Sequence, residues 1–243
     1  MTNSSDLASS GMGQTSAIHN SIHWPEYVDM IQRIIAKKQD PVLMDMGAGG
    51  GRDAIMMHDF AKAHDLNPLS IAVDMDANKL YDAQREFEGR FEQAANFMQV
   101  DQAHRRGKIS YMVEQLPYLQ TALSSQLTNP ALPKVKIDFM LCNAVVMFIP
   151  KHRVGRSLQH MVDMLSPDRG GQLLLGFSTT RPAEFMHVKD QRYTSEQVDN
   201  ILGRLKDIDE AIGKYELMDP PSSKHPNGRG FSWHFRLIKR SPA

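Results

Sequence analysis

Cysteine, charge of one sign and long apolar runs are all scarce in this sequence of 243 residues. Cys142 is the single cysteine, which excludes a disulfide framework, a multi-cysteine metal site and a three-cysteine iron–sulfur motif. The 28 basic side chains equal the 28 acidic ones, so no basic excess points to a nucleic-acid partner. No apolar run reaches membrane-spanning length, and no charged-then-apolar signal pattern opens the chain. We therefore expect a soluble, cytoplasmic protein without nucleic-acid or membrane partners.

Several signatures of catalysis are also missing. The ten histidines form no HExxH pattern and no helical pair with an acid at metal-binding spacing, so we expect no metal site. The chain has no Gly-x-Ser-x-Gly nucleophile elbow and no glycine loop with a Gly-Lys-Ser or Gly-Lys-Thr ending. With 41% hydrophobic and 23% charged residues, it can bury the core of one large α/β domain.

The most informative stretch is PVLMDMGAGGGRD, residues 41–53. Apolar residues surround Asp45 and predict a buried strand, four glycines follow, and a helical pattern begins after Arg52 and Asp53. Glycine suits this place because the chain must turn sharply and let a ligand approach where a Cβ would collide. A strand, a glycine turn and a helix in this order predict a nucleotide-like ligand at the carboxyl edge of a doubly wound sheet.

The spacing of the glycines distinguishes between ligands. The dinucleotide fingerprint G-x-G-x-x-G would place a small residue at position 52, where this chain has Arg52. Residues 45–51 instead spell D-x-G-x-G-x-G, which resembles the first motif of the class I S-adenosylmethionine (SAM)-dependent methyltransferases. In that family the turn lies under the methionine part of SAM. The resemblance implies cofactor-binding roles for the acid and the turn: Asp45, Gly47, Ala48, Gly49 and Gly51.

A second buried strand is predicted for residues 70–73, and it ends at Asp74. A carboxylate there can accept two hydrogen bonds from a ribose diol, a device shared by SAM-binding and dinucleotide-binding proteins. The stretch AVDMDANKL resembles the second motif of the methyltransferases, which implies that Met75 lies against the adenine ring. Asp76 is placed to cap the next helix, because the positive end of a helix favours a carboxylate.

The pattern after Asp76 predicts one amphipathic helix with a possible break at Gly89. Its apolar positions recur every three to four residues: Leu80, Ala83, Phe87, Phe91, Ala94 and Met98. We expect the third strand at residues 109–113. An alternative third strand, residues 96–100, would end at Asp101.

The stretch EQLPYL after residue 113 resembles the third motif of the family, in which an acid just past the strand pairs with the adenine amino group. The resemblance implies this role for Glu114, followed by the Leu-Pro that begins at Leu116. The spacing departs from the common pattern by about two residues, so Gln115 or a backbone amide is the alternative partner of adenine.

Residues 136–150, KIDFMLCNAVVMFIP, predict the central strand and the turn beyond it. Residues 137–142 form a nearly continuous apolar run, as expected for a parallel strand covered on both faces. Asn143 follows at the carboxyl end, over the cofactor cleft. The stretch resembles the fourth motif of small-molecule methyltransferases, with Asp138 near the strand start and Ile-Pro after the apolar turn.

The remaining pattern predicts a helix, a strand, a helix capped by Thr194 or Ser195, and two final strands. Their ranges are 151–165, 172–177, 194–212, 215–218 and 231–238. Together with the resemblance, this order predicts an α/β fold with a doubly wound, mostly parallel seven-stranded sheet. Helices cover both of its faces, and an antiparallel hairpin ends the chain.

Residues 1–14 are rich in Ser, Gly and Asn and predict a flexible N-terminal tail. The SAM-dependent methyltransferase domain is expected over residues 15–243, with a helical cap over about 15–40. In similar methyltransferases an N-terminal helix covers the cofactor and helps to form the substrate pocket.

The resemblance implies methyl transfer from SAM to a small-molecule O-, N- or C-nucleophile, with S-adenosylhomocysteine (SAH) as the product. Because the sulfonium makes the methyl group electrophilic, the protein must mainly hold the acceptor in line in a dry pocket. Where the acceptor needs a base, His187 is a candidate because it lies in a variable polar stretch. Candidate substrate contacts are Tyr27, Met147, Arg181 and Arg229. An NAD(P)-dependent oxidoreductase and a non-catalytic SAM-binding protein are the alternatives.

Overall fold

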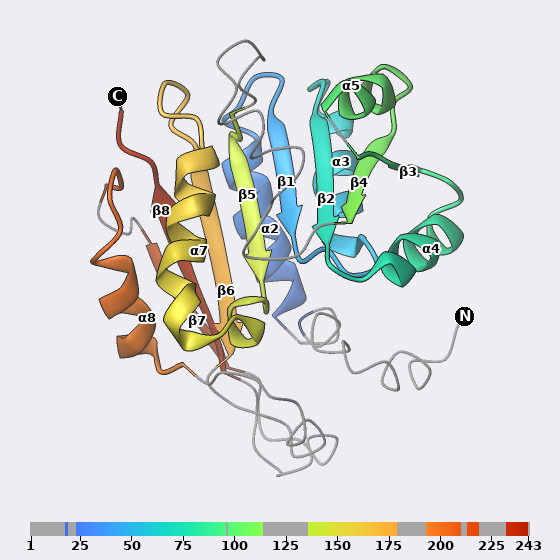
Figure 1. Cartoon of the computed structure of the whole chain (residues 1–243). Coiled ribbons are helices and arrows are strands. Elements are labelled where there is room, and N and C mark those ends of the chain that lie inside the picture. The colour runs from blue at the N-terminus through green and yellow to red at the C-terminus, as the bar shows by residue number, and fades with distance from the viewer. Residues whose placement is uncertain are drawn as a thin grey trace.

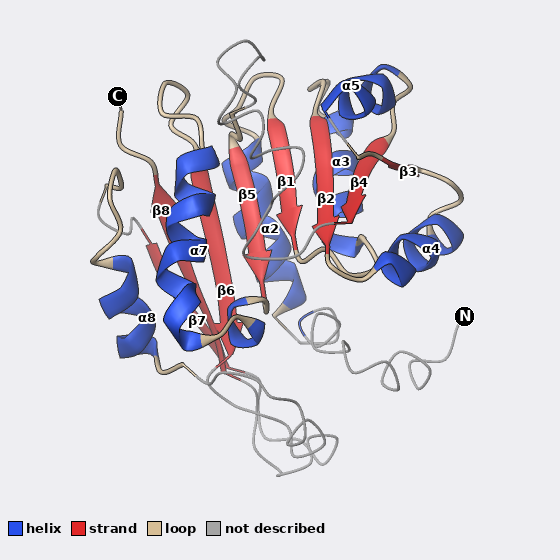
Figure 2. Cartoon of the chain, viewed as in Figure 1, coloured by secondary structure: helices blue, strands red, loops and turns tan. Residues whose placement is uncertain are grey.

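The computed structural model describes residues 18, 23–95, 97–113, 136–178, 193–209, 213–218 and 232–242. At positions 97, 147, 178, 218 and 232 only the backbone is described. These ranges form an α/β structure in which helices lie on both faces of a central sheet (Figure 2).

The described ranges contain eight strands, which form one sheet in the order β3-β4-β2-β1-β5-β6-β8-β7 (Figure 1). Their bounds are β1 (Val42–Met46), β2 (Leu69–Asp74), β3 (Phe91–Gln93), β4 (Ile109–Val113), β5 (Phe139–Asn143), β6 (Gln172–Ser178), β7 (Gly213–Met218) and β8 (Ser232–Lys239). Strands β1 to β6 pair in parallel, whereas β8 runs antiparallel to both β6 and β7. Because β1 lies between β2 and β5, the strand order reverses there, and ligands of open α/β sheets bind at the carboxyl ends of the strands at such a point.

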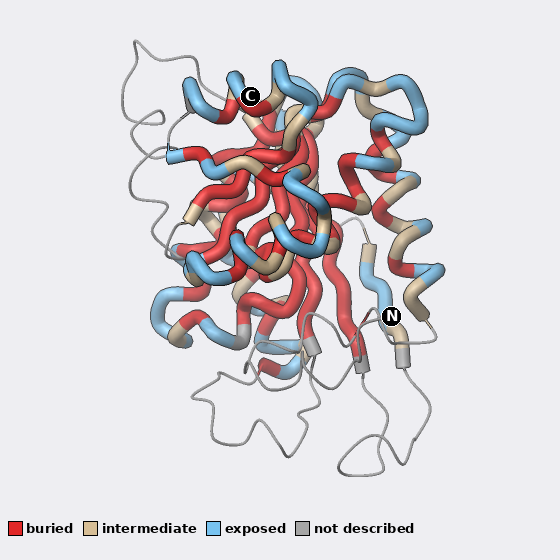
Figure 3. Tube along the Cα trace, turned by 90° about the vertical axis from the view of Figure 1, so that its right-hand side faces the viewer, coloured by how far each residue is buried: buried red, intermediate tan, exposed pale blue. Residues whose placement is uncertain are grey.

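Two layers of helices enclose this sheet. One face carries α2 (Trp24–Ile35), α3 (Arg52–Ala63) and α4 (Ala77–Glu86), and the other carries α5 (Phe97–Arg105), α7 (Lys151–Met164) and α8 (Ser195–Leu202). A short 3-10 helix, η2 (Val146–Phe148), follows β5. The strands alternate their side chains between the two layers, so Leu43 packs under α2 and Met44 packs under α7. The buried chain in Figure 3 is accordingly concentrated in the sheet between the two helix layers.

The helix predicted from Leu80 to Met98 is wrong as one element. The chain forms α4, turns at Gly89 with φ +71°, forms the edge strand β3 and then enters α5. Phe91 belongs to β3, where it pairs with Ile109 and is 2% exposed. The residues with helical spacing therefore belong to separate environments: Leu80, Ala83 and Phe91 share one core cluster, Ala94 lies in another, and Met98 is 74% exposed. The added strand makes the sheet eight-stranded instead of seven-stranded, and the alternative strand at residues 96–100 is also wrong because α5 occupies that region.

The predicted fold class is confirmed, including the antiparallel C-terminal hairpin. Asp76 caps α4 through the backbone N–H of Asn78, as predicted. Thr194 caps α8 in a capping box with Gln197, but the helix ends at Leu202 and does not continue to residue 212. The predicted N-terminal tail lies outside the described residues. None of the helices in the described ranges is both long enough and apolar enough to cross a bilayer.

Candidate functional site

The glycine turn lies directly after β1, at the point where the strand order reverses. Gly47, Gly49 and Gly51 adopt φ values of +77°, +52° and +80°, a backbone region that favours glycine. The N–H groups of Gly47 and Ala48 both donate to the carbonyl of Val73, at 2.8 and 2.9 Å. The turn is thus held against the end of β2, and α3 begins immediately after it.

Two of these glycines are also required by packing within the protein. A Cβ on Gly47 would lie 2.2 Å from Cγ2 of Val145, and a Cβ on Gly51 would lie 2.4 Å from Cζ of Phe91. By contrast, a Cβ on Gly50 would meet no atom within 4 Å. The sequence argument explained the glycines by the approach of a ligand, and the structure adds this second reason.

Asp74 lies at the carboxyl end of β2, as predicted, and is 5% exposed. Its Oδ2 accepts the N–H of Gly49 at 2.8 Å, and its Oδ1 accepts the N–H of Asp76 at 2.9 Å. A carboxylate has about four acceptor positions, so both oxygens keep the capacity to accept a ligand hydroxyl. Met75 follows and is 62% exposed, which leaves an apolar side chain next to the turn.

Tyr111 was not selected from the sequence, but it supports the same turn. Its hydroxyl donates to the carbonyl of Gly49 at 2.5 Å. Burial and the nearby charges of Asp74 and Asp45 raise the pKa of Tyr111 far above its ordinary value, so the phenol remains a donor. Its position in β4, two strands away from β1, gives no local signal of this contact.

Asp45 carries the clearest electrostatic anomaly of the site. Its side chain is 2% exposed, accepts a hydrogen bond from the backbone N–H of Ala54, and has no hydrogen-bond partner at Oδ2. Burial is the main cause of a pKa well above the ordinary carboxyl value, and the negative charges of Asp53 and Asp74 raise it further. A buried acceptor without a partner costs free energy, which a cationic or hydrogen-bond-donating ligand would recover.

Tyr27 connects the N-terminal helix to this site. Its hydroxyl donates to Oδ2 of Asp53 at 2.9 Å, and Nδ2 of Asn143 donates to the same hydroxyl at 3.4 Å. Tyr27 is fully buried, and burial together with Asp53 and Asp45 raises its pKa well above the ordinary value. The hydroxyl therefore acts as a neutral link between α2, α3 and β5.

The end of β5 shows backbone strain beside this link. Ala144 has φ +58°, a conformation that costs free energy for a residue with a Cβ, and its N–H donates to the carbonyl of Gly176 at 2.9 Å. Asn143 precedes it at the strand end, as predicted, with 3% exposure and no hydrogen-bond partner at Oδ1. A Cβ on Gly176 would lie 2.4 Å from that oxygen, so glycine at 176 makes room for the amide.

Sequence analysis missed Asp53, although it ends the glycine-rich stretch. An acid in the first turn of a helix is usually explained by the helix dipole alone, and that explanation hides a buried role. The signal that could have identified it is its position two residues after the last glycine, next to the cleft. Asp53 is 7% exposed in the structure.

Several predicted site residues cannot be placed. Six of them lie outside the described residues: Glu114, Gln115, Leu116, Arg181, His187 and Arg229. Met147 lies in η2 next to the end of β5, and only its backbone is described. Their predicted roles stay predictions.

Metal and thiol chemistry have little support among the described residues. The described ranges contain no group of three or more His, Cys, Asp or Glu side chains that could hold a metal ion. Cys142 is fully buried, and burial together with the charge of Asp45 raises the pKa of its thiol to about 12. The thiol therefore stays protonated and is a poor nucleophile.

No family model and no curated protein matches this sequence. Solved structures match nearly all of it. Magnesium protoporphyrin IX methyltransferase from Synechocystis PCC 6803, with bound SAM, is 15% identical over 99% of this chain and 92% of its own, with a TM-score of 0.54. The Burkholderia thailandensis 1,6-didemethyltoxoflavin-N1-methyltransferase, with bound SAH, is 12% identical over 98% of this chain and 86% of its own, with a TM-score of 0.58. The chain has the class I methyltransferase fold.

The class I methyltransferase fold is not restricted to proteins named as methyltransferases. The [4+2]-cyclase SpnF is 11% identical over 90% of this chain and 81% of its own, with a TM-score of 0.56. At these identities the likeness is one of fold. In this fold β8 lies antiparallel between β6 and β7, an arrangement absent from the dinucleotide-binding strand order 3-2-1-4-5-6.

Proposed function

We propose that this protein binds SAM at the carboxyl edge of β1 and β2 and transfers its methyl group to a small-molecule acceptor. The observation that carries the proposal is the partnerless oxygen of Asp45, buried beside the glycine turn of a class I methyltransferase fold. SAM carries two cationic groups, an ammonium and a sulfonium. A buried carboxylate oxygen is stabilised most strongly by a positive charge.

The charges around the turn favour SAM over NAD(P). Asp45, Asp53 and Asp74 are all buried beside the turn, and the charges of Asp53 and Asp74 disfavour ionisation of Asp45. A dinucleotide would bring an anionic pyrophosphate to the same turn, which these carboxylates would repel. This electrostatic argument agrees with Arg52 at the position where the dinucleotide fingerprint needs a small residue.

In the proposed site each described residue has a separate task. Asp45 accepts from the cationic end of the cofactor, and the glycine turn provides backbone close to it. Asp74 holds the ribose diol through its remaining acceptor positions, and Met75 provides an apolar surface for the adenine ring. The roles of Glu114, Gln115 and Leu116 around adenine stay predictions from the resemblance.

The reaction asks little acid–base chemistry of these residues. Bound SAM supplies an electrophilic methyl group, so the chain must orient the acceptor and exclude water. The hydrogen bond from Asn143 to the hydroxyl of Tyr27 ties α2 to the end of β5. We expect α2, held in this way, to border the acceptor pocket. We propose an O-, N- or C-nucleophile as the acceptor and His187 as the base where the acceptor needs one; the cytoplasmic location stays a prediction.

Isothermal titration calorimetry tests the proposed cofactor. We expect wild-type protein to bind SAM and SAH and not NAD. Asp45→Asn should weaken SAM binding roughly tenfold or more, because a bound cation would stabilise the ionised form of Asp45, which asparagine cannot adopt. Asp101→Asn, an exposed acid on α5, is the matched control and should leave binding unchanged. Tight NAD binding without SAM binding would refute the proposal.

A second measurement addresses catalysis. Purified protein incubated with SAM and a panel of phenols, amines and carbon acids should release SAH with one of these acceptor classes. The similarity to the [4+2]-cyclase makes this step necessary, because one solved protein of this fold is named as a cyclase and not as a methyltransferase. SAM binding together with a conversion of acceptor that releases no SAH would favour that alternative.

A further inference from the structure

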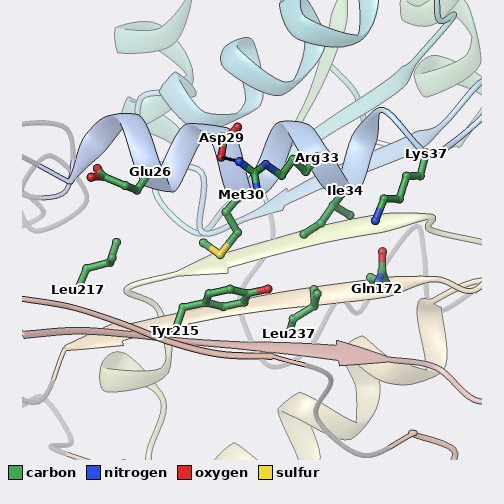
Figure 4. A pocket seen from close by; sticks show the side chains of 10 residues that line it. All are labelled: Glu26, Asp29, Met30, Arg33, Ile34, Lys37, Gln172, Tyr215, Leu217 and Leu237. Carbon is green, nitrogen blue, oxygen red and sulfur yellow. Dashed lines mark ion pairs between the residues drawn. The ribbon is translucent and has the colours of Figure 1, made fainter.

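A groove lies on the outer surface between α2 and the antiparallel end of the sheet. Its volume is about 410 Å³, and Figure 4 shows helix α2 along one side and strand residues along the other. Apolar side chains from both sides form its floor: Met30, Ile34, Tyr215, Leu217 and Leu237. Tyr215 is 40% exposed, so its ring adds apolar surface to the groove. The proposed cofactor site shares none of these residues.

The charges along the groove are ordered by sign. Glu26 and Asp29 line its border at the start of α2, and Arg33 and Lys37 line it at and just beyond the helix end. Asp29 and Arg33 form an ion pair at 2.6 Å within the helix, with side chains 53% and 76% exposed. Glu26 has an exposed side chain (60%), and Lys37 is also exposed. The groove therefore has an acidic end and a basic end around an apolar middle.

Four of the groove residues on and just beyond α2 are spaced symmetrically in the sequence. Glu26, Met30 and Arg33 follow on α2 at spacings of four and three, and Lys37 comes four residues later in the turn after the helix; these four residues are here named the α2 stripe. Reversing this stripe about its midpoint exchanges Glu26 with Lys37 and Met30 with Arg33. An identical helix that lies antiparallel would thus present Lys37 to Glu26 and Glu26 to Lys37, while Asp29 and Arg33 keep their ion pair within each helix.

We propose that this groove is the interface of a two-fold symmetric dimer in which α2 packs antiparallel against α2 of a second copy of this chain. Glu26 then faces Lys37 of the second copy, and each such contact occurs twice because the interface is isologous. The aliphatic stem of Arg33 covers Met30 of the second copy, and the two helices fill the apolar middle of the grooves. The surface so covered includes Tyr215.

The opposite charges of Glu26 and Lys37 at the two ends of the groove favour a second copy of this chain over other binding partners. A partner of one sign would be repelled at one end of the groove, whereas the same stripe reversed is attracted at both ends. A single helix-on-helix contact is smaller than the roughly 800 Å² per partner of standard interfaces. We therefore expect a weak dimer that dissociates on dilution. This inference does not depend on the proposed function.

Sedimentation velocity across a micromolar concentration series tests the dimer with two charge reversals. Glu26→Lys alone places lysine against lysine twice, and Lys37→Glu alone places glutamate against glutamate twice. We expect each variant alone to weaken dimerisation roughly tenfold or more. An equimolar mixture of the two should form a heterodimer, because every contact between unlike variants again joins opposite charges.

The mixture also controls for folding, because a misfolded variant could not form a heterodimer with the other variant. Arg85→Glu, an exposed reversal on α4, is the matched control and should leave the dimer unchanged. A wild-type protein that stays monomeric throughout the series would overturn the proposal. So would a dimer that both reversals leave intact, or a pair of variants that remain monomeric when mixed.

Discussion

Two polar clusters in this molecule each contain buried charged residues and differ in how their charges are matched. The acidic cluster consists of Asp45, Asp53 and Asp74 around the glycine turn. The second cluster, here named the Arg236 cluster, consists of Arg236, Asp199, Lys214 and Ser195 and joins β8 and β7 to α8.

In the Arg236 cluster every charge is paired. Arg236 is 1% exposed, and its Nε donates to Oδ1 of Asp199 at 2.7 Å while Nη2 reaches Ser195. Lys214 donates to Oδ2 of Asp199 at 2.8 Å. The hydrogen bond from Arg236, followed by that from Lys214, lowers the pKa of Asp199. The pKa of Asp45 moves in the opposite direction, mainly because of burial.

This difference separates a structural link from a binding site. A buried ion pair with satisfied hydrogen bonds holds two elements together and needs nothing further. A buried carboxylate among other acids is costly to the empty protein and becomes favourable only when a cation arrives. The contrast predicts that substitutions in the two clusters should have different consequences for stability.

The largest effect is expected from Asp199→Ala. It leaves the buried guanidinium of Arg236 without its carboxylate, which should lower the free energy of unfolding by about 3–5 kcal/mol. Urea denaturation measures this loss. Asp101→Ala removes a carboxylate of similar geometry from exposed Arg105 and should cost less than about 1 kcal/mol. Equal losses in the two variants would show that the Arg236 cluster contributes no more than a surface pair.

A somewhat smaller loss is expected from Gly51→Ala, which tests the turn that supports the acidic cluster. The variant combines φ +80° with a Cβ 2.4 Å from Phe91, and it should destabilise the protein by about 2–4 kcal/mol. Gly50→Ala is the control, because its Cβ would meet nothing within 4 Å. Thermal denaturation of both variants decides the point, and a Gly51→Ala protein as stable as Gly50→Ala would contradict it.

The pH dependence of stability should have opposite signs in the two clusters. Burial keeps Asp45 protonated in the folded chain above the ordinary carboxyl pKa of about 4, so the folded chain binds more protons there. The stability contributed by protonated Asp45 is therefore lost as pH rises from about 4 through its folded pKa. Asp199 has a lowered pKa, so its contribution is full above about pH 4 and is lost as pH falls.

Denaturation curves at several pH values test these signs with Asp45→Asn and Asp199→Asn. Relative to wild type, Asp45→Asn should gain stability as pH rises above about 4, by at most about 1.4 kcal/mol per pH unit. Relative to wild type, Asp199→Asn should recover as pH falls below about 4. Wild-type and Asp45→Asn curves that run parallel would argue against a protonated carboxyl at Asp45.

The smallest effect is expected from Tyr27→Phe. The variant keeps the ring contacts with Trp24 and Phe235 and removes only the hydroxyl that links Asp53 and Asn143. Loss of this link should cost about 1 kcal/mol of stability, measurable by urea denaturation. Tyr81→Phe, at a position 69% exposed, should change nothing. A Tyr27→Phe protein as stable as the wild type would show that the link carries no net energy.

The local sequence pattern was sufficient to predict those parts of the structure that depend on residues close together in the chain. The glycine turn, the acid at the end of β2 and a cap at Thr194 or Ser195, which the structure places at Thr194, were all predicted, because each depends on residues a few positions apart. The edge strand β3 was missed because three residues carry too little periodicity, and only pairing with β4 makes them extended. The hydrogen bonds of Tyr27 were also missed, since their partners lie 26 and 116 residues away.

By itself the sequence determined that a buried strand ends in a glycine turn, that a carboxylate ends the next strand, and that this pattern resembles a SAM-binding family. Only the tertiary structure decided which carboxylates are paired. Asp199 meets Arg236 across 37 residues of chain, whereas Asp45 is surrounded by other acids. The reason is physical: burial and the distance to the nearest charge set the energy of a carboxylate, and both depend on how remote segments pack.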